Sequence, residues 1–210
     1  MTPETNSLID TADPPIAAAI FDFDGTLVDT MPLHFEAYRR VLADAGVELS
    51  HEDFYGSIGG NARETIPLFL RGRPCRLSTE EIHLRKKQLM QTLLSENAPP
   101  VLEAAKLLPV LHGRMPLALA SSGSRLGIEM ILARLSWRHY FAAIVTGEDA
   151  VRGKPAPDLF LLAAEKLGVP PETCIVFEDT DAGMAAAQAA GMRAFDVRRT
   201  HTRSVAERAP

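Results

Sequence analysis

The chain has 210 residues, of which 46% are hydrophobic and 23% are charged, and its formal net charge is −5. That length accommodates one domain with a large insertion or two small domains, and the composition is that of a globular protein. The acidic balance argues against an extended nucleic-acid-binding surface, and no apolar run approaches the length of a membrane span.

The first segment, 1–14, is polar and contains no Lys or Arg, so it does not resemble a signal peptide, and we expect a disordered tail. Cys75 and Cys174 lie far apart without CxxC spacing, which fits a reducing compartment and argues against a zinc site. We therefore expect a cytoplasmic protein that binds neither nucleic acid nor membranes. Nothing in the sequence requires an oligomer, so we also expect a monomer.

An unbroken apolar run at 16–20 leads directly into Phe-Asp-Phe-Asp-Gly at 21–25. Such a run favours a strand buried on both faces, and alternation along the strand places Asp22 and Asp24 on the same side. Two neighbouring carboxylates repel each other unless a cation or a shared proton holds them, and Gly25 allows a sharp turn. The pair suits Mg²⁺, although a solvated acidic turn gives the same short pattern.

Helical patterns dominate the next seventy residues. They predict helices over 31–46, 51–58, 62–72 and 79–95. Asn61 precedes the third of these helices, and Ser78 and Glu81 form a capping box for the fourth. Pro99-Pro100 then marks a junction. We therefore expect residues 31–100 to form an all-helical insert, the cap.

From residue 101 onward, helical and strand patterns alternate. The predicted strands are 115–120, 142–146, 173–177 and 192–197, and the predicted helices are 101–113, 124–135, 157–167 and 182–190. This alternation implies a Rossmann-like α/β fold, a parallel sheet with helices on both faces, built from residues 15–30 and 101–210. Ligands of such sheets bind beyond the carboxyl ends of the strands.

Polar residues stand at those strand ends. The hydroxyl-rich segment 121–124 precedes a helix and suits a phosphate, although Ser124 also reads as an ordinary helix cap. Lys154 stands in a loop stiffened by two prolines, where a solvated lysine is the usual finding. Glu178 and Asp179 follow an apolar strand. Neighbouring strand residues point in opposite directions, so we expect only one of them to bind a metal directly.

These four groups, in this order, resemble the motifs of the haloacid dehalogenase-like phosphohydrolase superfamily. The matching stretches are DFDGTLVDT, ALASSG, KPAPD and FEDTDAG, and the resemblance spans residues 16–197. The insert after the first motif is similar to that of the subgroup with a four-helix cap. Within this subgroup the second half of the chain looks most like bacterial fructose-1-phosphate phosphatases, and β-phosphoglucomutases are near relatives.

The resemblance implies a role for each acidic residue. Asp22 corresponds to the nucleophile that takes the phosphoryl group as an aspartyl phosphate. Asp24 corresponds to the general acid that protonates the leaving oxygen and then to the base that activates water. Mg²⁺ is expected to be held by Asp22, by the backbone carbonyl of Asp24 and by Asp179, with Glu178 behind these ligands or acting through water.

The resemblance also suggests which residues meet the substrate. Its phosphate-binding positions are Ser121, Ser122 and Lys154. In the cap and at its hinge, His34 is expected beside Asp24, while Arg63 and Lys87 reach the distal polar groups of the substrate. Ordinary surface positions explain these three cap residues equally well.

The expected function is that of a Mg²⁺-dependent phosphatase acting on a small phosphorylated metabolite, such as the sugar phosphate fructose 1-phosphate. A β-phosphoglucomutase is the alternative, although Thr26 stands where such mutases carry valine. A phospho-accepting receiver module is more remote, because receivers lack the large helical insert. A dehalogenase has no leaving alkoxide to protonate and no use for the second acidic pair.

Overall fold

The computed structural model describes residues 13–57 and 62–199, and the side chains of residues 62–64 lie outside that description. The expected tail at 1–14 and the cap residue Asn61 therefore fall largely or wholly outside the described residues. The centre of the molecule is a sheet of five parallel strands in the order β3-β2-β1-β4-β5. The strands are β1 (Ala18–Phe21), β2 (Leu117–Ala120), β3 (Phe141–Val145), β4 (Cys174–Glu178) and β5 (Arg193–Asp196).

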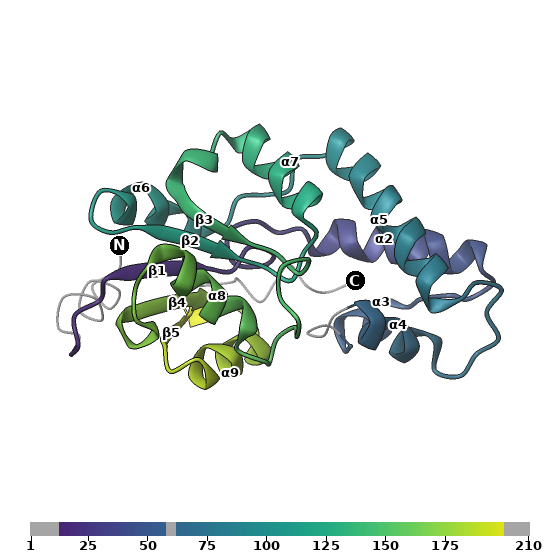
Figure 1. The fold of residues 1–210 in the computed structure, drawn as a ribbon. Coiled ribbons are helices and arrows are strands. Elements are labelled where there is room, and N and C mark those ends of the chain that lie inside the picture. The colour runs from purple at the N-terminus through teal and green to yellow at the C-terminus, as the bar shows by residue number, and fades with distance from the viewer. Residues whose placement is uncertain (1–12, 58–61, 200–210) are drawn as a thin grey trace.

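Helices cover both faces of the sheet, as Figure 1 shows. Alternate residues of β1 serve the two faces: Ala19 and Phe21 belong to one apolar cluster, and Ala18 and Ile20 belong to the other. The first cluster is covered by α6 (Leu107–His112) and α7 (Arg125–Leu135), and the second by α8 (Asp158–Leu167) and α9 (Asp181–Ala189). The predicted α/β core is confirmed.

Short 3₁₀ helices accompany these elements. They are η1 (Glu103–Lys106), η2 (Arg138–Tyr140), η3 (Pro171–Thr173) and η4 (Val197–Arg199). The sequence pattern predicts one continuous helix over 101–113, but the structure has η1 followed directly by α6. Pro109 has no N–H to donate to the carbonyl of Ala105, and the backbone takes the tighter 3₁₀ turn there.

The helical cap is inserted between β1 and β2, and no strand interrupts it in the described residues. Its helices are α2 (Met31–Asp44), α3 (His51–Tyr55), α4 (Ala62–Leu70) and α5 (Thr79–Glu96). The cap has an apolar cluster of its own, which includes Tyr38, Phe54 and Phe69. The predicted capping box of Ser78 and Glu81 is confirmed at the start of α5.

Two connections join the cap to the core, and they run antiparallel beside each other. The N–H of Asp29 donates to the carbonyl of Pro100 at 2.8 Å, and the N–H of Leu102 donates to that of Leu27 at 2.9 Å. Val28 and Val101 pair between these two hydrogen bonds. The predicted junction at the two prolines therefore lies directly against the exit from the first motif.

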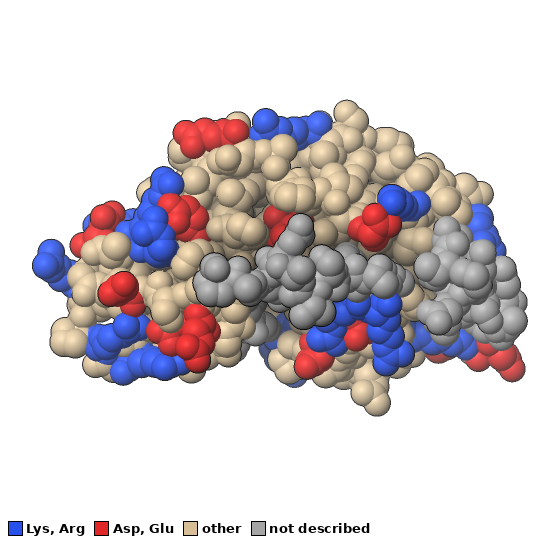
Figure 2. All heavy atoms as spheres, turned by 180° about the vertical axis from the view of Figure 1, so that it is seen from behind, with Lys and Arg blue, Asp and Glu red and all other residues tan. Residues whose placement is uncertain are grey.

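The surface charge, the cysteines and the length of the helices each bear on a prediction from the sequence. On the face shown in Figure 2, basic and acidic side chains lie interspersed over the described residues. Both cysteines are free thiols, and Cys174 is buried in the sheet. Within the described residues, no helix combines the length and the apolar character needed to cross a membrane.

Candidate active site

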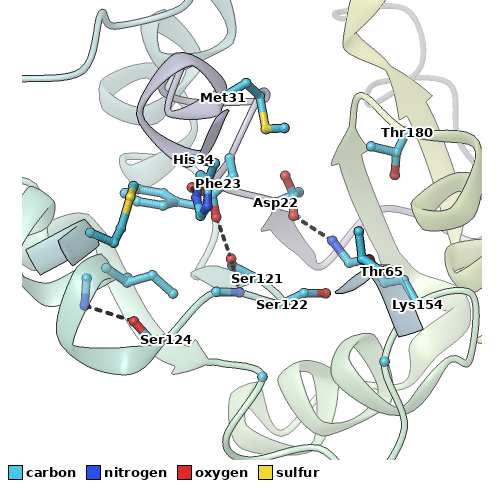
Figure 3. A pocket seen from close by; sticks show the side chains of 18 of the residues that line it. Asp22, Phe23, Met31, His34, Thr65, Ser121, Ser122, Ser124, Lys154 and Thr180 are labelled. Atoms are coloured by element: carbon cyan, nitrogen blue, oxygen red, sulfur yellow. Dashed lines mark hydrogen bonds and ion pairs between the residues drawn. The ribbon is translucent and has the colours of Figure 1, made fainter. Parts of the chain in front are cut away.

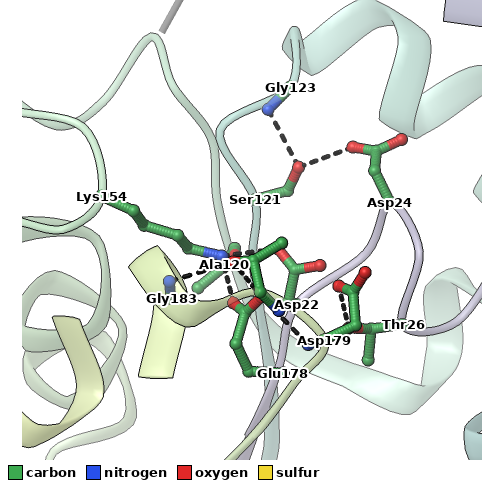
Figure 4. A network of polar contacts seen from close by, with 11 residues as sticks. Asp22, Asp24, Thr26, Ala120, Ser121, Gly123, Lys154, Glu178, Asp179 and Gly183 are labelled. Carbon is green, nitrogen blue, oxygen red and sulfur yellow. Dashed lines mark hydrogen bonds and ion pairs between the residues drawn. The ribbon is translucent and has the colours of Figure 1, made fainter. Parts of the chain in front are cut away.

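The floor of the candidate site lies at the carboxyl ends of β1 and β4. Asp22 directly follows β1, and Glu178 is the last residue of β4. Lys154 reaches both from the loop after β3: its ammonium donates to Asp22 Oδ1 at 2.5 Å and to Glu178 Oε2 at 2.7 Å (Figure 4). The side chain of Lys154 is 6% exposed and lies 4.9 Å from the centre of the Phe160 ring. This is a buried ion cluster with more acidic than basic groups.

The pKa values at this floor follow from burial and crowding. Burial raises the pKa of Asp22 well above its usual range, and Glu178 raises it further, while Lys154 opposes the rise. Burial and the charge of Glu178 raise the pKa of Asp179 to about 6. Burial lowers the pKa of Lys154, but Asp22 and Glu178 outweigh that effect and raise it. A bound cation would relieve this excess of negative charge.

Three carboxylates converge where a cation would bind. Asp22, Glu178 and Asp179 each offer an oxygen, and these oxygens lie within 4.8 Å of one another. Glu178 Oε1 accepts hydrogen bonds from the N–H groups of Asp179 and Thr180, at 3.0 and 2.9 Å, and Oε2 accepts from Lys154. Hard oxygen donors of this kind fit Mg²⁺. The carboxylate of Asp24 lies outside the cluster, which leaves its backbone carbonyl as the ligand implied by the resemblance.

Strand alternation suggests that only one member of the second acidic pair faces the site, but the structure brings both side chains to it. The reason is that β4 ends at Glu178, so alternation no longer holds for Asp179. Thr26 donates to Asp179 Oδ1 at 3.0 Å and holds it toward the floor. A Cβ on Gly25, whose φ is +93°, would stand 2.3 Å from Asp179 Oδ2. A Cβ on Gly183 would stand 2.0 Å from Glu178 Cδ, so both carboxylates pack against bare backbone.

Asp24 is held in a separate set of contacts. Its carboxylate accepts from Thr30 Oγ1 at 2.5 Å and from Ser121 Oγ at 3.0 Å, and His34 Nε2 lies 3.7 Å away. Burial raises the pKa of Asp24, but the hydrogen bonds and the charge of His34 lower it to about 2. The N–H of Gly123 donates to Ser121 Oγ at 2.9 Å. Thr30 was not predicted from the sequence, since an isolated threonine before a helix gives no distinctive signal.

Lys86 and Lys87 of α5 contact different partners. Lys86 Nζ lies 2.7 Å from His34 Nδ1 and 4.9 Å from the centre of the Tyr38 ring. Burial lowers the pKa of Lys86 to about 8, and burial and Lys86 together lower that of His34. Lys87, the residue predicted from the sequence, lines the cavity and pairs with Glu148 of the core at 2.9 Å. Lys86 was not singled out, because spacing alone does not tell which side of a helix faces a partner.

A cavity of about 880 Å³ lies between the cap and the core. Figure 3 shows Asp22, Ser121 and Lys154 from the core and Met31 and His34 from α2 around this space. Ser122 and Ser124 also line it, and its apolar wall includes Met90, Leu94, Ile128 and Ile131. Arg63 belongs to α4, but its side chain lies outside the described part of the structure. The volume is in the range of pockets that enclose small organic molecules.

Comparison with known proteins supports a hydrolase. Residues 16–191 match the profile of the haloacid dehalogenase-like hydrolase family. The chain is 36% identical over 182 residues to fructose-1-phosphate phosphatase YqaB of Escherichia coli, across 87% of this chain and 96% of that protein. It is 39% identical over 179 residues to a phosphorylated carbohydrates phosphatase of Thermotoga maritima, across 83% of this chain and 82% of that protein.

A solved structure shares the fold as well. The crystal structure of a CbbY variant from Rhodobacter sphaeroides, in complex with xylulose 1,5-bisphosphate, matches with a TM-score of 0.78 and 28% identity. The match covers 85% of this chain and 84% of that chain. The helical cap and the sheet are therefore aligned together in a protein that holds a phosphorylated sugar.

Proposed function

The chain belongs to the haloacid dehalogenase-like hydrolase family and is a phosphatase, and from this premise we propose that it hydrolyses sugar phosphates such as fructose 1-phosphate. The observation that carries the proposal is the placement of Asp22, Lys154 and Asp24 at the floor of one cavity. A carboxylate nucleophile, a cation for the phosphoryl oxygens and a second carboxyl for proton transfer are what this reaction needs. The names of the phosphatase relatives support the sugar as substrate.

We propose the reaction that the resemblance implies, with the two aspartates in its two roles. An oxygen of Asp22 forms a bond to phosphorus as the bond from phosphorus to the leaving alcohol breaks, and Asp24 gives that alcohol its proton. Water then attacks the phosphorus of the aspartyl phosphate as the bond from phosphorus to the Asp22 oxygen breaks, and Asp24 takes the proton of the water. This step releases inorganic phosphate and returns Asp22 to its carboxylate form. With a pKa of about 2, Asp24 is ionised in the free enzyme. The negative charge of the substrate, bound beside Asp24, raises that pKa and favours the protonated acid.

The three carboxylates at the floor fit Mg²⁺. As the resemblance implies, Asp22, Asp179 and the backbone carbonyl of Asp24 would hold the ion, and Glu178 would act from behind these ligands or through water. When bound, the ion supplies charge neutralisation at the phosphoryl oxygens. Lys154 supplies a second positive charge from the protein itself. The close approach of two anions, the Asp22 carboxylate and the phosphate ester, requires such neutralisation.

The remaining contacts to the substrate come from the core loop and the cap. Ser121 and Ser122 face the cavity where the phosphate group is expected, next to Asp24. On the cap side, His34 and Lys86 contact each other and line the same cavity, and Arg63 is the second residue of α4. We propose that residues 31–100 act as the cap that excludes water and contacts the sugar.

A screen of phosphate release over a panel of metabolites, with and without Mg²⁺, tests the proposal. Hexose phosphates should be hydrolysed in the presence of Mg²⁺, and Asp22→Asn should abolish turnover without loss of the fold. The proposal is wrong if no phosphate ester is hydrolysed or if Asp22→Asn retains substantial activity.

A β-phosphoglucomutase is the second candidate, because a mutase must bind a sugar bisphosphate and the similar CbbY structure holds one. The distinguishing step is the fate of the aspartyl phosphate, which water attacks in a phosphatase and a sugar hydroxyl attacks in a mutase. Given β-glucose 1-phosphate with a trace of the 1,6-bisphosphate, this enzyme should release phosphate and form little glucose 6-phosphate. Formation of glucose 6-phosphate faster than phosphate release would support the mutase instead.

We further infer a cytoplasmic monomer. The free thiols of Cys75 and Cys174 fit a reducing compartment, and nothing in the sequence requires an oligomer. Light scattering after size exclusion should give a mass near the 22.9 kDa of the chain. A mass twice as large would contradict the monomer.

A further inference from the structure

The turn after β3, residues 146–149, is held by hydrogen bonds and an ion pair whose residues have no role in the proposed reaction. Asp149 Oδ2 accepts from the N–H of Thr146 at 2.7 Å, from Thr146 Oγ1 at 2.9 Å and from Arg125 Nη2 at 2.5 Å. The N–H of Asp149 donates to the carbonyl of Thr146 at 2.9 Å. These contacts lower the pKa of Asp149, against the effect of burial, so it stays charged. The side chain of Asp149 therefore holds the turn closed and anchors it to the start of α7.

The same turn presses against the loop that carries the phosphate-binding serines. The N–H of Gly147 donates to the carbonyl of Gly123 at 3.1 Å. A Cβ on Gly147 would stand 2.4 Å from the carbonyl oxygen of Ser122, so the two backbones meet without room for a side chain. Ser121 in turn donates to Asp24. A chain of direct contacts therefore joins the turn to Asp24: Gly147 contacts Gly123, Gly123 contacts Ser121, and Ser121 contacts Asp24.

On its other side the turn meets the cap. Lys87 of α5 pairs with Glu148 at 2.9 Å, and the two side chains are 37% and 47% exposed. Glu148 is the residue between Gly147 and Asp149, so the ion pair acts on the segment that touches Ser122. The ion pair therefore connects α5 to the turn that contacts the loop of residues 121–123.

We propose that residues 146–149 form a positioning turn, which holds loop 121–123 in place beside Asp24. The turn also connects this position of the loop to helix α5 of the cap. In this arrangement Gly147 and Asp149 are positioning residues, and Lys87 stabilises the turn through Glu148 rather than binding the sugar. The inference rests on the proposed phosphatase function, because only turnover makes the positioning measurable. Phosphoryl transfer depends on the placement of the reacting groups, and a displacement of 1 Å can lower the rate by roughly a hundredfold.

The first test replaces Gly147 and uses Gly113, where an added Cβ meets nothing within 4 Å, as the matched control. Gly147→Ala should lower kcat for fructose 1-phosphate by about tenfold or more, while Gly113→Ala leaves kcat unchanged. Should Gly147→Ala fail to fold, Asp149 gives the same readout: Asp149→Ala should lower kcat, and Asp149→Asn, which keeps an acceptor oxygen, should restore part of it. Unchanged kcat in Gly147→Ala or in Asp149→Ala would overturn the proposal.

The second test asks what Lys87 contacts in the working enzyme. Lys87→Met and Glu148→Gln should each lower kcat/KM by about two- to fivefold, the range for an exposed ion pair, and the double variant should be no worse than either. The charge-swapped pair, Lys87→Glu with Glu148→Lys, should restore activity, and Lys106→Met, which breaks an exposed pair with Glu103 elsewhere, should have no effect. A loss in Lys87→Met without a loss in Glu148→Gln would show that Lys87 binds the substrate, and would overturn its assignment to the turn.

Failure of the positioning turn is distinguishable from failure of the proposed function. If the wild-type enzyme hydrolyses none of the sugar phosphates, the proposed function is wrong. If the wild-type enzyme is active and the Gly147 and Asp149 variants match it, only the positioning turn is wrong. Thermal unfolding of every variant shows whether a lost activity reflects a lost fold.

Discussion

Lys154 offsets part of the negative charge at the floor of the site. Its ammonium contacts Asp22 and Glu178 at 2.5 and 2.7 Å, and none of the three side chains is exposed. Removal of one member of such a buried group leaves the others charged without a partner, which typically costs about 3–5 kcal/mol. Asp22 and Glu178 raise the pKa of Lys154 despite its burial, so it stays protonated throughout the neutral range.

Lys154→Met should therefore lower the free energy of unfolding by about 3–5 kcal/mol in the presence of EDTA. Mg²⁺ should recover more stability in this variant than in the wild type, because the bound ion replaces the missing positive charge. Urea unfolding at pH 8, with EDTA and with Mg²⁺, measures both effects. Lys106→Met is the control and should cost less than about 1 kcal/mol, because its pair is exposed. Equal losses of unfolding free energy in the two variants would show that the buried carboxylates do not depend on the charge of Lys154.

Tyr38 gives stability a dependence on alkaline pH. Its phenol is buried, and burial raises its pKa from 10.0 to about 12. Below pH 10 both the folded and the unfolded states hold the proton, so Tyr38 does not affect the pH dependence there. Above pH 10 the unfolded chain loses the proton first, so the stability contributed by Tyr38 falls as the pH rises toward about 12.

Between pH 9 and 11 the wild type should consequently lose about 1 kcal/mol more stability than Tyr38→Phe, which has no phenolic proton. Urea unfolding of both proteins at several pH values gives the difference, and effects of other groups cancel. A constant difference across this range would mean that the phenol titrates alike in the folded and unfolded states.

At the level of single residues, sequence spacing predicts a cluster of polar side chains better than it predicts their partners. Asp22 and Lys154 lie together because each follows a strand of one parallel sheet. Which of Lys86 and Lys87 contacts His34 depends on the rotation of α5 against α2, which is set by packing between distant segments. The joint approach of Glu178 and Asp179 depended on where β4 ends, and the pattern of apolar residues does not fix that point.

At the level of elements, helix α5 is the part of the cap that the sequence specifies most fully. Ser78 Oγ accepts from the N–H of Glu81, and the side chain of Glu81 accepts from the N–H of Ser78 at 2.8 Å. Each half of this box satisfies an N–H that the helix itself leaves unpaired. The strands were predicted in the same local way, from short apolar runs. The split of 101–113 into η1 and α6 was missed, because it follows from a missing donor rather than from the apolar pattern.

Ser78→Ala should lower the free energy of unfolding by about 1 kcal/mol, the usual effect of losing a helix cap. Ser95→Ala is the matched control near the other end of α5. Its hydroxyl is exposed and donates to the carbonyl of Thr92, so its removal should cost less than about 0.5 kcal/mol. Urea unfolding of the two variants provides the measurement, and equal effects would show that the capping box does not stabilise α5.

At the level of the whole molecule, helix α5 of the cap also packs against the core. Met90 and Leu94 of α5 lie in the same buried cluster as Ile128 and Ile131 of α7. Arg134 of α7 donates to the carbonyl of Leu94 at 3.1 Å. The cap therefore packs against the core through apolar contacts close to the cavity.

Mg²⁺ should raise the thermal stability of the wild type, and EDTA should abolish both that gain and turnover. An ion present at a hundred times its dissociation constant stabilises the folded state by about 2.7 kcal/mol. Asp179→Asn should weaken the Mg²⁺-dependent gain in thermal stability, because Asp179 belongs to the carboxylate cluster. The Asn side chain has nearly the same shape as that of Asp but carries no charge. Differential scanning calorimetry against Mg²⁺ concentration measures the effect. Full activity in EDTA would contradict the metal site.

The chain leaves the core for the cap and returns to it at neighbouring points. Asp29 and Pro100, at these two points, are joined by a hydrogen bond of 2.8 Å, so the ends of the inserted segment lie side by side. A different segment placed between residues 30 and 100 would therefore have to bring its own ends to this spacing. It would also have to replace the apolar contacts of Met90 and Leu94 with Ile128 and Ile131, because cap and core share that buried cluster.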